Sequence, residues 1–241
     1  IRDRTPLNED GSANKTAIKK VISSISPFVK DGQLVILKST VPPFTSENDV
    51  AKPLRKFAKV DVAFCPERLS EGNAIEECRN IPIVVGGVDK ASGERAKIFW
   101  ETALGVKCYL VKNSRAAELV KLADNAWIDL NIALAFELAK LADNIEIDIL
   151  EVIQAANSLP KGEHNVNILL PSLGVGGYCL TKDPLFLNSF SKSYGTIFKT
   201  AIASREINDE SPIYAAKKID QELKKQFTKI ESNNIQIGVL G

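Results

Sequence analysis

The sequence predicts an α/β protein in which a parallel sheet, covered by helices, is followed by a long helix and a mainly helical region. Two observations predict this order. Short apolar segments alternate with amphipathic helical segments over residues 13–112, which is typical of a parallel sheet with covered faces. After residue 113, about 30 residues contain no proline or glycine and are rich in Ala, Leu and Glu, which is typical of a long helix.

The first half contains the elements of the expected sheet. Apolar residues at helical spacing predict a helix within residues 13–30, and an Asp-Gly turn leads from it into a strand at residues 34–37. Further strands are expected at residues 60–64, 81–85 and 108–111, and a further helix at residues 91–102. Ligands bind where the carboxyl ends of parallel strands meet. This edge is expected to carry Ser39-Thr40, Pro66-Glu67 and Gly86-Gly87.

The second half is expected to be mainly helical. A helix at residues 114–144, capped by Asn113 or Ser114, would be on the order of 45 Å long. Because it is apolar on more than one face, we expect it to connect the sheet domain with the helical region and to pack against a second copy in a homodimer. Residues 148–159 and 200–227 supply further helices, and residues 235–241 are typical of the first strand of a new unit.

Charge and hydrophobicity exclude several classes of partner. The chain has 31 Lys and Arg against 30 Asp and Glu, so it has no basic field to attract nucleic acid or anionic lipid. No apolar run approaches the roughly 20 residues that cross a bilayer, and the first residues have no apolar core of a signal peptide. We therefore expect a cytoplasmic protein that binds neither nucleic acid nor membrane.

The cysteines and the single histidine do not predict a metal site. Cys65, Cys78, Cys108 and Cys179 form no CxxC pair, and His164 alone cannot complete a cluster of ligands. We expect no bound metal, buried reduced thiols at the first three cysteines, and a surface position for His164.

The glycine-rich loop GVGGYCLTKDP, residues 174–184, is the first candidate for chemistry. Cysteine attacks as the thiolate, which cations and backbone N–H groups stabilise, and Cys179 is followed by Lys182 and Asp183. Three glycines would let the backbone approach a ligand closely. They are Gly174, Gly176 and Gly177. The alternative is that Cys179 is a buried structural thiol beside a glycine turn.

Two further groups of polar residues are candidates. Glu118, Lys121 and Asn125 lie at i, i+3 and i+7 on one stripe of the long helix, where the alternative is a solvated charged face. Glu67 and Glu71 lie four residues apart in FCPERLSEG and could supply a general base or position a water molecule. Their alternative is a salt-bridged loop or a first helical turn.

Four motifs together carry a resemblance to a known family. LVILKSTVPP, FCPERLSEG, AAELVKLADNAW and PSLGVGGYCLTKDP, in this order and at these separations, resemble the UDP-glucose/GDP-mannose dehydrogenase family of NAD-dependent nucleotide-sugar 6-dehydrogenases. The resemblance implies three regions. Residues 1–112 would be the later part of a Rossmann-like NAD-binding domain, residues 113–230 the long helix with a helical central dimerisation domain, and residues 231–241 the start of the nucleotide-sugar domain.

The reaction that the resemblance implies is a four-electron oxidation. The C6 alcohol of a UDP-sugar, first of all UDP-N-acetylmannosamine, would become a carboxylate while two NAD+ are reduced in turn. Cys179 would add to the intermediate aldehyde to give a thiohemiacetal, whose oxidation gives a thioester that water hydrolyses. UDP-glucose and UDP-N-acetylglucosamine are the alternative substrates.

The resemblance also implies roles for individual residues. Lys121 and Asn125 would stabilise the negative oxygen that develops on C6, and Asp183 would hold Lys121 or orient the hydrolytic water. Glu67 would act as base through a water molecule, to which Thr40 would contribute its hydroxyl. Contacts to NAD are expected from Thr5, Thr40, Glu71 and Lys182. Substrate contacts are expected from Leu173, Gly174, Gly176, Gly177, Lys121 and Asn125.

The chain departs from the family in three places. It contains no GxGxxG turn to hold the NAD pyrophosphate, which is expected before residue 1, and it ends at the first strand of the expected nucleotide-sugar domain. Asn165 stands where relatives often carry an arginine that reaches the neighbouring subunit's substrate. As printed, the chain is expected to bind NAD weakly and to lack part of its substrate contacts.

Two other readings stay open. A β-hydroxyacid dehydrogenase would transfer a single hydride with a lysine and an asparagine on the long helix, and would need no cysteine. A non-catalytic dimerising or sugar-nucleotide-binding module would bind its ligand without forming NADH.

Overall fold

The computed structural model describes residues 5–70 and 72–226, and residues 236 and 238, of the 241-residue chain. Two compact units are present: residues 1–130 with 176–205, and residues 131–175 with 206–241. The strand expected at residues 235–241 falls mostly outside the described residues. The domain boundaries implied by the resemblance stay a prediction.

A four-stranded sheet forms the centre of the first unit. Its strands are β1 (Leu34–Leu37), β2 (Asp61–Phe64), β3 (Ile83–Gly87) and β4 (Cys108–Leu110), in that order across the sheet. Strands β1 and β2 pair in parallel, as do β3 and β4, which agrees with the expected α/β class. The β2–β3 pair is antiparallel, with Phe64 opposite Gly86.

The direction of β3 corrects the expected ligand edge. Because β3 runs against β2, its carboxyl end points away from Thr40 and Glu67, and Gly86 and Gly87 pair with Phe64 and Ala63 inside the sheet. These two glycines serve packing instead. A Cβ on Gly86 would lie 2.3 Å from the Asn113 carbonyl oxygen, and a Cβ on Gly87 would lie 2.2 Å from the backbone nitrogen of Gly93.

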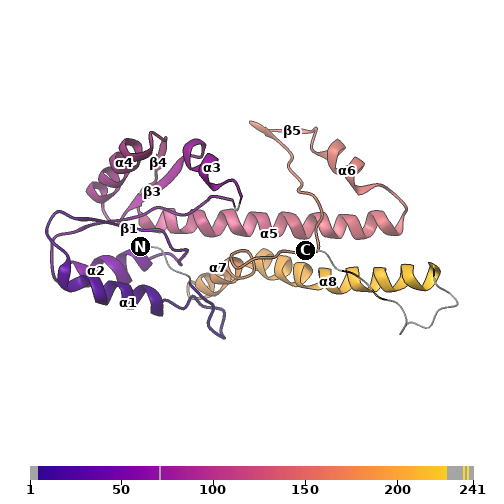
Figure 1. The fold of residues 1–241 in the computed structure, drawn as a ribbon, viewed down its shortest axis with the longest axis horizontal. Coiled ribbons are helices and arrows are strands. Elements are labelled where there is room, and N and C mark those ends of the chain that lie inside the picture. Colours follow the sequence, from indigo (N-terminus) through magenta and orange to yellow (C-terminus); the bar gives the residue numbers. More distant parts are fainter. Residues whose placement is uncertain (1–4, 71, 227–235, 237, 239–241) are drawn as a thin grey trace. The chain divides into compact units, whose positions relative to one another are not determined.

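Helices cover both faces of the sheet (Figure 1). One face packs against α1 (Thr16–Ile25), the short π-helix η2 (Ser46–Ala51) and α2 (Lys52–Leu54), and its core includes Ile18 and Val50. The other face packs against α4 (Lys90–Leu104). The short 3₁₀ helix η1 (Ser26–Phe28) follows α1, and α3 (Ala74–Asn80) lies between β2 and β3.

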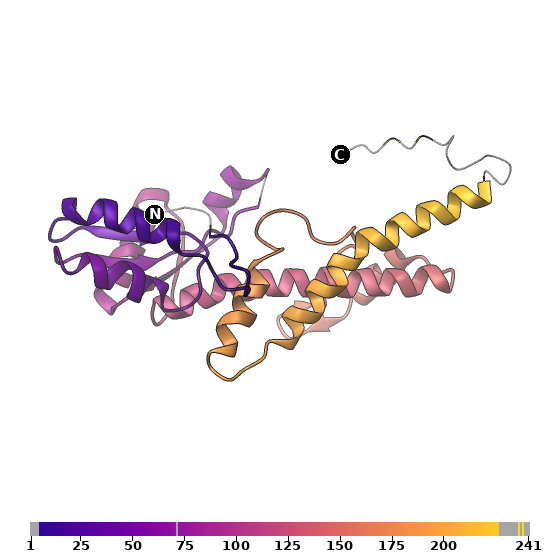
Figure 2. The same cartoon turned by 90° about the horizontal axis from the view of Figure 1, so that it is seen from below.

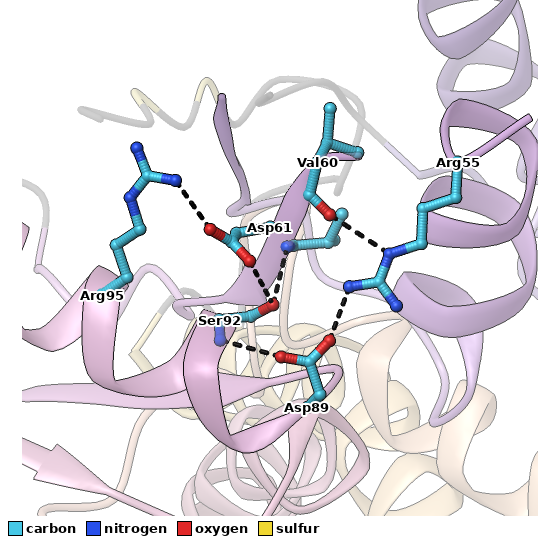
Figure 3. Close-up of polar contacts among 7 residues, drawn as sticks. Arg55, Val60, Asp61, Asp89, Ser92 and Arg95 are labelled. Atoms are coloured by element: carbon cyan, nitrogen blue, oxygen red, sulfur yellow. Dashed lines mark hydrogen bonds and ion pairs between the residues drawn. The ribbon is translucent and has the colours of Figure 1, made fainter. Parts of the chain in front are cut away.

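A polar network fixes the start of α4 (Figure 3). Asp89 caps the helix, because its carboxylate accepts a hydrogen bond from Ser92 N–H at 2.9 Å, and it also accepts one from Arg55 at 2.6 Å. Arg95 of α4 pairs with Asp61 of β2 at 2.6 Å, and the Ser92 hydroxyl donates to the same carboxylate at 3.4 Å. The network ties α4 to β2 and to the end of α2.

The later elements are mainly helical, as expected. Both α5 (Ser114–Asn144) and α8 (Lys199–Gln226) are continuous helices (Figure 2). Between them lie α6 (Ile149–Ala156), a hairpin of β5 (Pro160–Lys161) and β6 (His164–Asn165), and α7 (Asp183–Lys192). No helix in the described part of the chain is long and apolar enough to cross a membrane. The cytoplasmic location stays a prediction.

Candidate active site

Helix α5 carries the stripe of polar residues that the sequence singled out. The helix begins at Ser114, and the Asn113 side-chain oxygen accepts a hydrogen bond from Ala116 N–H at 3.0 Å, so Asn113 is its cap. Glu118 is 0% exposed and Asn125 is 4% exposed, while Lys121 is half-buried. The alternative of a solvated charged face is therefore wrong, because this stripe faces protein rather than water.

The turn before α7 places the candidate nucleophile. The Cys179 carbonyl accepts hydrogen bonds from the backbone N–H groups of Lys182 at 3.2 Å and Asp183 at 2.9 Å, which closes a tight turn. Helix α7 begins at Asp183, with Pro184 in its first turn, where a missing N–H costs nothing. Cys179 is exposed, so the alternative of a buried structural thiol is wrong.

Asp183 lies at the centre of a buried polar network. Its Oδ2 accepts a hydrogen bond from Asn125 Nδ2 at 2.6 Å, and Asn125 Oδ1 accepts one from Lys121 Nζ at 3.2 Å. Its Oδ1 lies 2.5 Å from Lys182 Nζ. The network links the turn of Cys179 to helix α5 and leaves Lys121 half-buried at its outer end.

Lys182 is a buried lysine whose ammonium group has partners within the protein. Lys182 is 5% exposed, and besides its ion pair with Asp183, its Nζ lies 4.6 Å from the centre of the Phe186 ring and 5.0 Å from that of Tyr178. A buried ammonium needs such partners to offset its lost hydration. In this structure the Lys182 ammonium group forms its ion pair with Asp183.

The loop after β2 places Glu67 beside a lysine. Glu67 Oε1 accepts hydrogen bonds from the backbone N–H groups of Arg68 at 3.1 Å and Leu69 at 3.2 Å, and Oε2 lies 3.4 Å from Lys38 Nζ. The Arg68 side chain donates to Asp124 of α5 at 2.9 Å. This ion pair connects the Glu67 loop to the residue directly before Asn125.

Thr40 follows β1 and is half-buried. The segment after it is also connected to α5, since Ser46 N–H donates a hydrogen bond to Glu118 Oε1 at 2.7 Å. Three segments far apart in the sequence therefore contact helix α5. They are the turn of Cys179 and Asp183, the loop of Glu67, and the segment that runs from Thr40 to Ser46.

Among the glycines of the loop, Gly174 has a packing role within the second unit. Its φ is +75°, and a Cβ there would lie 2.4 Å from the Asn208 carbonyl oxygen and 2.3 Å from Ser211 Oγ. Pro212 lacks the N–H that would bind this carbonyl within α8, and the Ser211 hydroxyl donates to it instead at 2.8 Å. Gly174 thus packs closely against the turn of α8 that contains Pro212.

The other candidate substrate contacts are open. A Cβ on Gly176 or on Gly177 would meet no atom within 4 Å, and Leu173 is an exposed apolar side chain. No packing role for Gly176 or Gly177 is seen among the residues that the structure describes. Asn165 is also exposed, on strand β6.

Comparison with known proteins decides the family. Residues 1–104 match the NAD binding domain of the UDP-glucose/GDP-mannose dehydrogenase family, and residues 115–210 match the central domain of the same family. The chain belongs to the UDP-glucose/GDP-mannose dehydrogenase family.

Several members of the family are similar to this chain. A UDP-N-acetyl-D-mannosamine dehydrogenase of Methanocaldococcus jannaschii is 42% identical over 215 residues, which are 89% of this chain and 48% of that protein. The Escherichia coli K12 enzyme of the same name is 34% identical over 90% of this chain and 52% of its own length. The chain therefore spans about half the length of the curated relatives it matches.

Solved structures give the same result. A UDP-D-ManNAc dehydrogenase from Pyrococcus horikoshii has a TM-score of 0.83 and 33% identity, over 92% of this chain and 52% of that one. A UDP-glucose dehydrogenase from Pyrobaculum islandicum has a TM-score of 0.82 and 29% identity, over 95% of this chain and 52% of that one.

The residues expected to contact NAD fit the cofactor in part. Thr5 is 3% exposed, and its hydroxyl is a buried group without a hydrogen-bond partner in the described part of the chain, as a residue that binds a ligand would be. Lys182 forms an ion pair with Asp183, and its contact with NAD stays a prediction. Glu71 lies outside the described residues.

The remaining cysteines and the histidine were mostly placed correctly. Cys65 and Cys108 are buried and free, and burial raises the pKa of the Cys65 thiol to about 11. Burial likewise raises the pKa of Cys108. Cys78 is only half-buried, because α3 packs loosely and buries none of its residues, so the expectation of a buried thiol is wrong there. His164 is exposed on β6.

The sequence did not point to Lys38, Arg68 or Asp124 as members of the site. Lys38 and Arg68 adjoin the motifs that carry Thr40 and Glu67, and Asp124 lies one residue before Asn125. Their position next to a motif residue is the signal in the sequence that could have identified these three residues. The ion pairs themselves join residues up to 56 positions apart, which local spacing does not reveal.

Proposed function

We propose that this chain is part of an NAD-dependent UDP-sugar 6-dehydrogenase that oxidises a C6 alcohol to a carboxylate through a covalent adduct on Cys179. The observation that supports the proposal is the hydrogen-bonded network of Asp183, Asn125 and Lys121. Asp183 lies in the turn that carries the exposed Cys179. An exposed thiol and a lysine held by an amide are the groups that the two oxidations need.

The first oxidation needs a base and a site for negative charge. Loss of the C6 hydroxyl proton, through a water molecule, is assigned to Glu67, whose Oε2 faces Lys38 at 3.4 Å. The alkoxide that forms would be stabilised by Lys121, because Asn125 Oδ1 accepts one of its N–H hydrogens and leaves the others for the substrate. When it is bound, NAD+ accepts a hydride in each of the two oxidations.

The second oxidation needs Cys179. Its thiolate adds to the aldehyde carbon, and the carbonyl oxygen takes up a proton to give a thiohemiacetal. Loss of a hydride and of the hydroxyl proton converts this adduct into a thioester, which water cleaves to the carboxylate and the free thiol. Asp183 is buried and bonded to Asn125, so its role in this proposal is to position Asn125 and Lys121 rather than to move a proton.

The proposed substrate is UDP-N-acetylmannosamine. The relatives from Methanocaldococcus jannaschii and Escherichia coli bear the name of UDP-N-acetyl-D-mannosamine dehydrogenases, and they align with about nine-tenths of this chain. The likeness to a UDP-glucose dehydrogenase supports UDP-glucose as the alternative. The open segment at Leu173, Gly176 and Gly177 would lie along the sugar and phosphates.

The chain would act as a homodimer through helix α5. Five large apolar side chains of this helix are at least 40% exposed although they recur along its length, which favours a partner surface. They are Leu119, Trp127, Leu130, Leu134 and Leu141. Light scattering on the purified chain is expected to give twice the 26.3 kDa of one copy. A monomer that persists at high concentration would contradict the proposal.

The experiment that tests the activity counts NADH. The full-length gene product is incubated with UDP-N-acetylmannosamine, and absorbance gives the NADH formed per sugar consumed. Two NADH per sugar are expected. A Cys179→Ser variant is expected to lose the second oxidation, whereas a Cys78→Ser variant, which changes a half-buried thiol on α3, is expected to keep it.

Other outcomes would favour other functions. One NADH per sugar, unchanged in the Cys179→Ser variant, would indicate single-hydride chemistry of the β-hydroxyacid dehydrogenase kind. No NADH with UDP-N-acetylmannosamine, UDP-glucose or UDP-N-acetylglucosamine, together with binding of one of them, would indicate a non-catalytic module.

A further inference from the structure

Glu118 is a buried carboxyl group that the proposed reaction does not use. It lies on α5 one turn before Lys121 and is 0% exposed. Its Oε1 accepts a hydrogen bond from Ser46 N–H at 2.7 Å, and Ser46 begins the π-helix η2, six residues after Thr40. The carboxyl group therefore joins the helix of Lys121 to the segment of Thr40.

The polar atoms around this carboxyl group can accommodate its neutral form. In the described part of the chain, Oε2 of Glu118 has no hydrogen-bond partner, and neither do the buried hydroxyls of Ser46 and Ser114. Ser114 lies one turn earlier on the same face of α5. Serine hydroxyls can donate to a carboxylate and can also accept from a neutral acid, so both forms can be hydrogen-bonded here, and a neutral acid can still accept from Ser46 N–H through Oε1. Full burial of the group is what disfavours the charged form.

Nearby charges do not offset a negative charge on Glu118. The charged groups that face it are Glu47 of η2 and Arg115 of α5, and these two pair with each other through two hydrogen bonds of 2.7 and 2.9 Å. The Arg115 guanidinium also lies 4.4 Å from the centre of the Phe44 ring. Arg115, a cation close enough to Glu118 to interact with it, is thus already bound to another carboxylate.

The segment that Glu118 holds is strained. Phe44 has a φ of +74°, a left-handed conformation that side chains of this size rarely adopt. Its ring is kept in place by a stacked contact with Tyr194 and by Arg115. Without the hydrogen bond from Ser46 N–H, two residues further on, this strain would favour release of the segment from α5.

We propose that Glu118 is a positioning residue, which in its neutral form holds the segment between Thr40 and Ser46 on helix α5. The roles of Thr40 and Lys121 in catalysis rest on the proposed function, whereas the hydrogen bond and its dependence on pH do not. When the proton leaves, the buried charge weakens the contact and the segment opens toward water.

The direction of the pH dependence follows from burial. Burial, and to a smaller extent the Glu47 charge, raises the pKa of Glu118 from 4.5 to about 7, although the nearby polar groups of Ser46 and Phe44 lower it. An open segment would return the carboxyl group to its ordinary pKa. Opening should therefore become easier by up to about tenfold for each pH unit between roughly 5 and 7, and should level off above 7.

Hydrogen–deuterium exchange of the Ser46 amide tests this inference in the chain itself. Protection, corrected for the intrinsic exchange rate at each pH, is expected to fall roughly 40-fold from pH 5 to pH 7 in the unmodified chain. A Glu118→Gln variant keeps one acceptor and one donor but cannot lose a proton. Its protection is expected to stay constant with pH. The exposed Glu101→Gln variant is the control and should behave as the unmodified chain.

Either of two results would overturn the inference. One is protection of Ser46 that does not change from pH 5 to pH 7, and the other is the same fall in the Glu118→Gln variant. A Glu118→Leu variant, which removes the acceptor, should lose protection at every pH; if it does not fold, the Glu118→Gln comparison decides. No substrate is used, so a failure to form NADH would refute the proposed function and leave this result unaffected.

Discussion

The buried ion pair of Lys182 and Asp183 allows a sharp test of the site's architecture. Asp183 is 0% exposed and Lys182 is 5% exposed, so each charge depends on the other for compensation. Removing one partner leaves an uncompensated buried charge, which costs about 3–5 kcal/mol. We expect this loss both in Lys182→Met, which isolates the carboxylate, and in Asp183→Asn, which isolates the ammonium.

The double variant is expected to be more stable than either single variant. With both changes no charge is buried, Met fills the space of the lysine stem beside Phe186, and the new amide oxygen can still accept the hydrogen bond from Asn125. The remaining cost is about 1 kcal/mol, since one ion pair is replaced by apolar packing and one neutral hydrogen bond.

Urea unfolding followed by tryptophan fluorescence measures these differences. Both tryptophans, Trp100 and Trp127, lie in the unit that contains Asp183, so the signal reports that unit. With a slope of roughly 2 kcal/mol per molar urea, the single variants should shift the midpoint down by about 1.5–2.5 M and the double variant by about 0.5 M. A double variant as unstable as both single losses together would refute the coupling.

Three further predictions concern other parts of the chain. Between about pH 5 and 7 the unmodified chain should lose about 2 kcal/mol of stability, since the raised pKa of Glu118 makes the folded state hold a proton that the unfolded state releases. Glu118→Gln should remove this slope in urea titrations. Gly174→Ala should lower the melting temperature more than Gly177→Ala, because both have positive φ but only the former meets a backbone oxygen, at 2.4 Å. Iodoacetamide at pH 8 should label Cys179 and spare Cys65 in peptide mass maps, and equal labelling would contradict their exposures.

The sequence predicted the positions of the strands better than their directions in the sheet. The strands at residues 34–37, 60–64, 81–85 and 108–111 were found within two residues of their observed bounds, because each is a short apolar run between turn residues. The reversed direction of β3 was missed, since an apolar run has the same pattern in both directions. The choice is made by residues 65–82, which include α3 and bring the chain back antiparallel to β2.

The sequence pattern did not predict η2, α2, α3 or α7. Two of these, η2 and α7, were missed for different reasons. Residues 46–51 are polar and follow two prolines, which is typical of a loop, and their helix depends on burial of Val50 and Ala51 against the sheet. Helix α7 had a local signal in Asp183-Pro184, because proline is favoured in a first helical turn. The glycine-rich run directly before it is typical of a loop and hides this signal.

The site was predictable as a set of residues but not as a network. The stripe of α5 follows from helical spacing, and the family motifs supplied Cys179 and Asp183. The contact between Asn125 and Asp183 joins positions 58 apart, and no periodicity reveals it. The same holds for the ion pair of Lys182 with Asp183. From the motif, Lys182 was expected to contact the cofactor, and the ion pair within the protein was not foreseen.

The two anchors of helix α5 constrain how the gene can change. Asn125 binds Asp183, and one turn later Asp129 accepts hydrogen bonds from Ser204 at 2.7 Å and Arg205 at 2.6 Å. A helix turns by about 100° per residue, so a codon inserted between the two anchors would swing Asp129 away from its partners while Asn125 stayed in place. Gene sequences of the family are therefore expected to keep this interval free of insertions and deletions, while the exposed hairpin at Pro160–Asn165 varies in length.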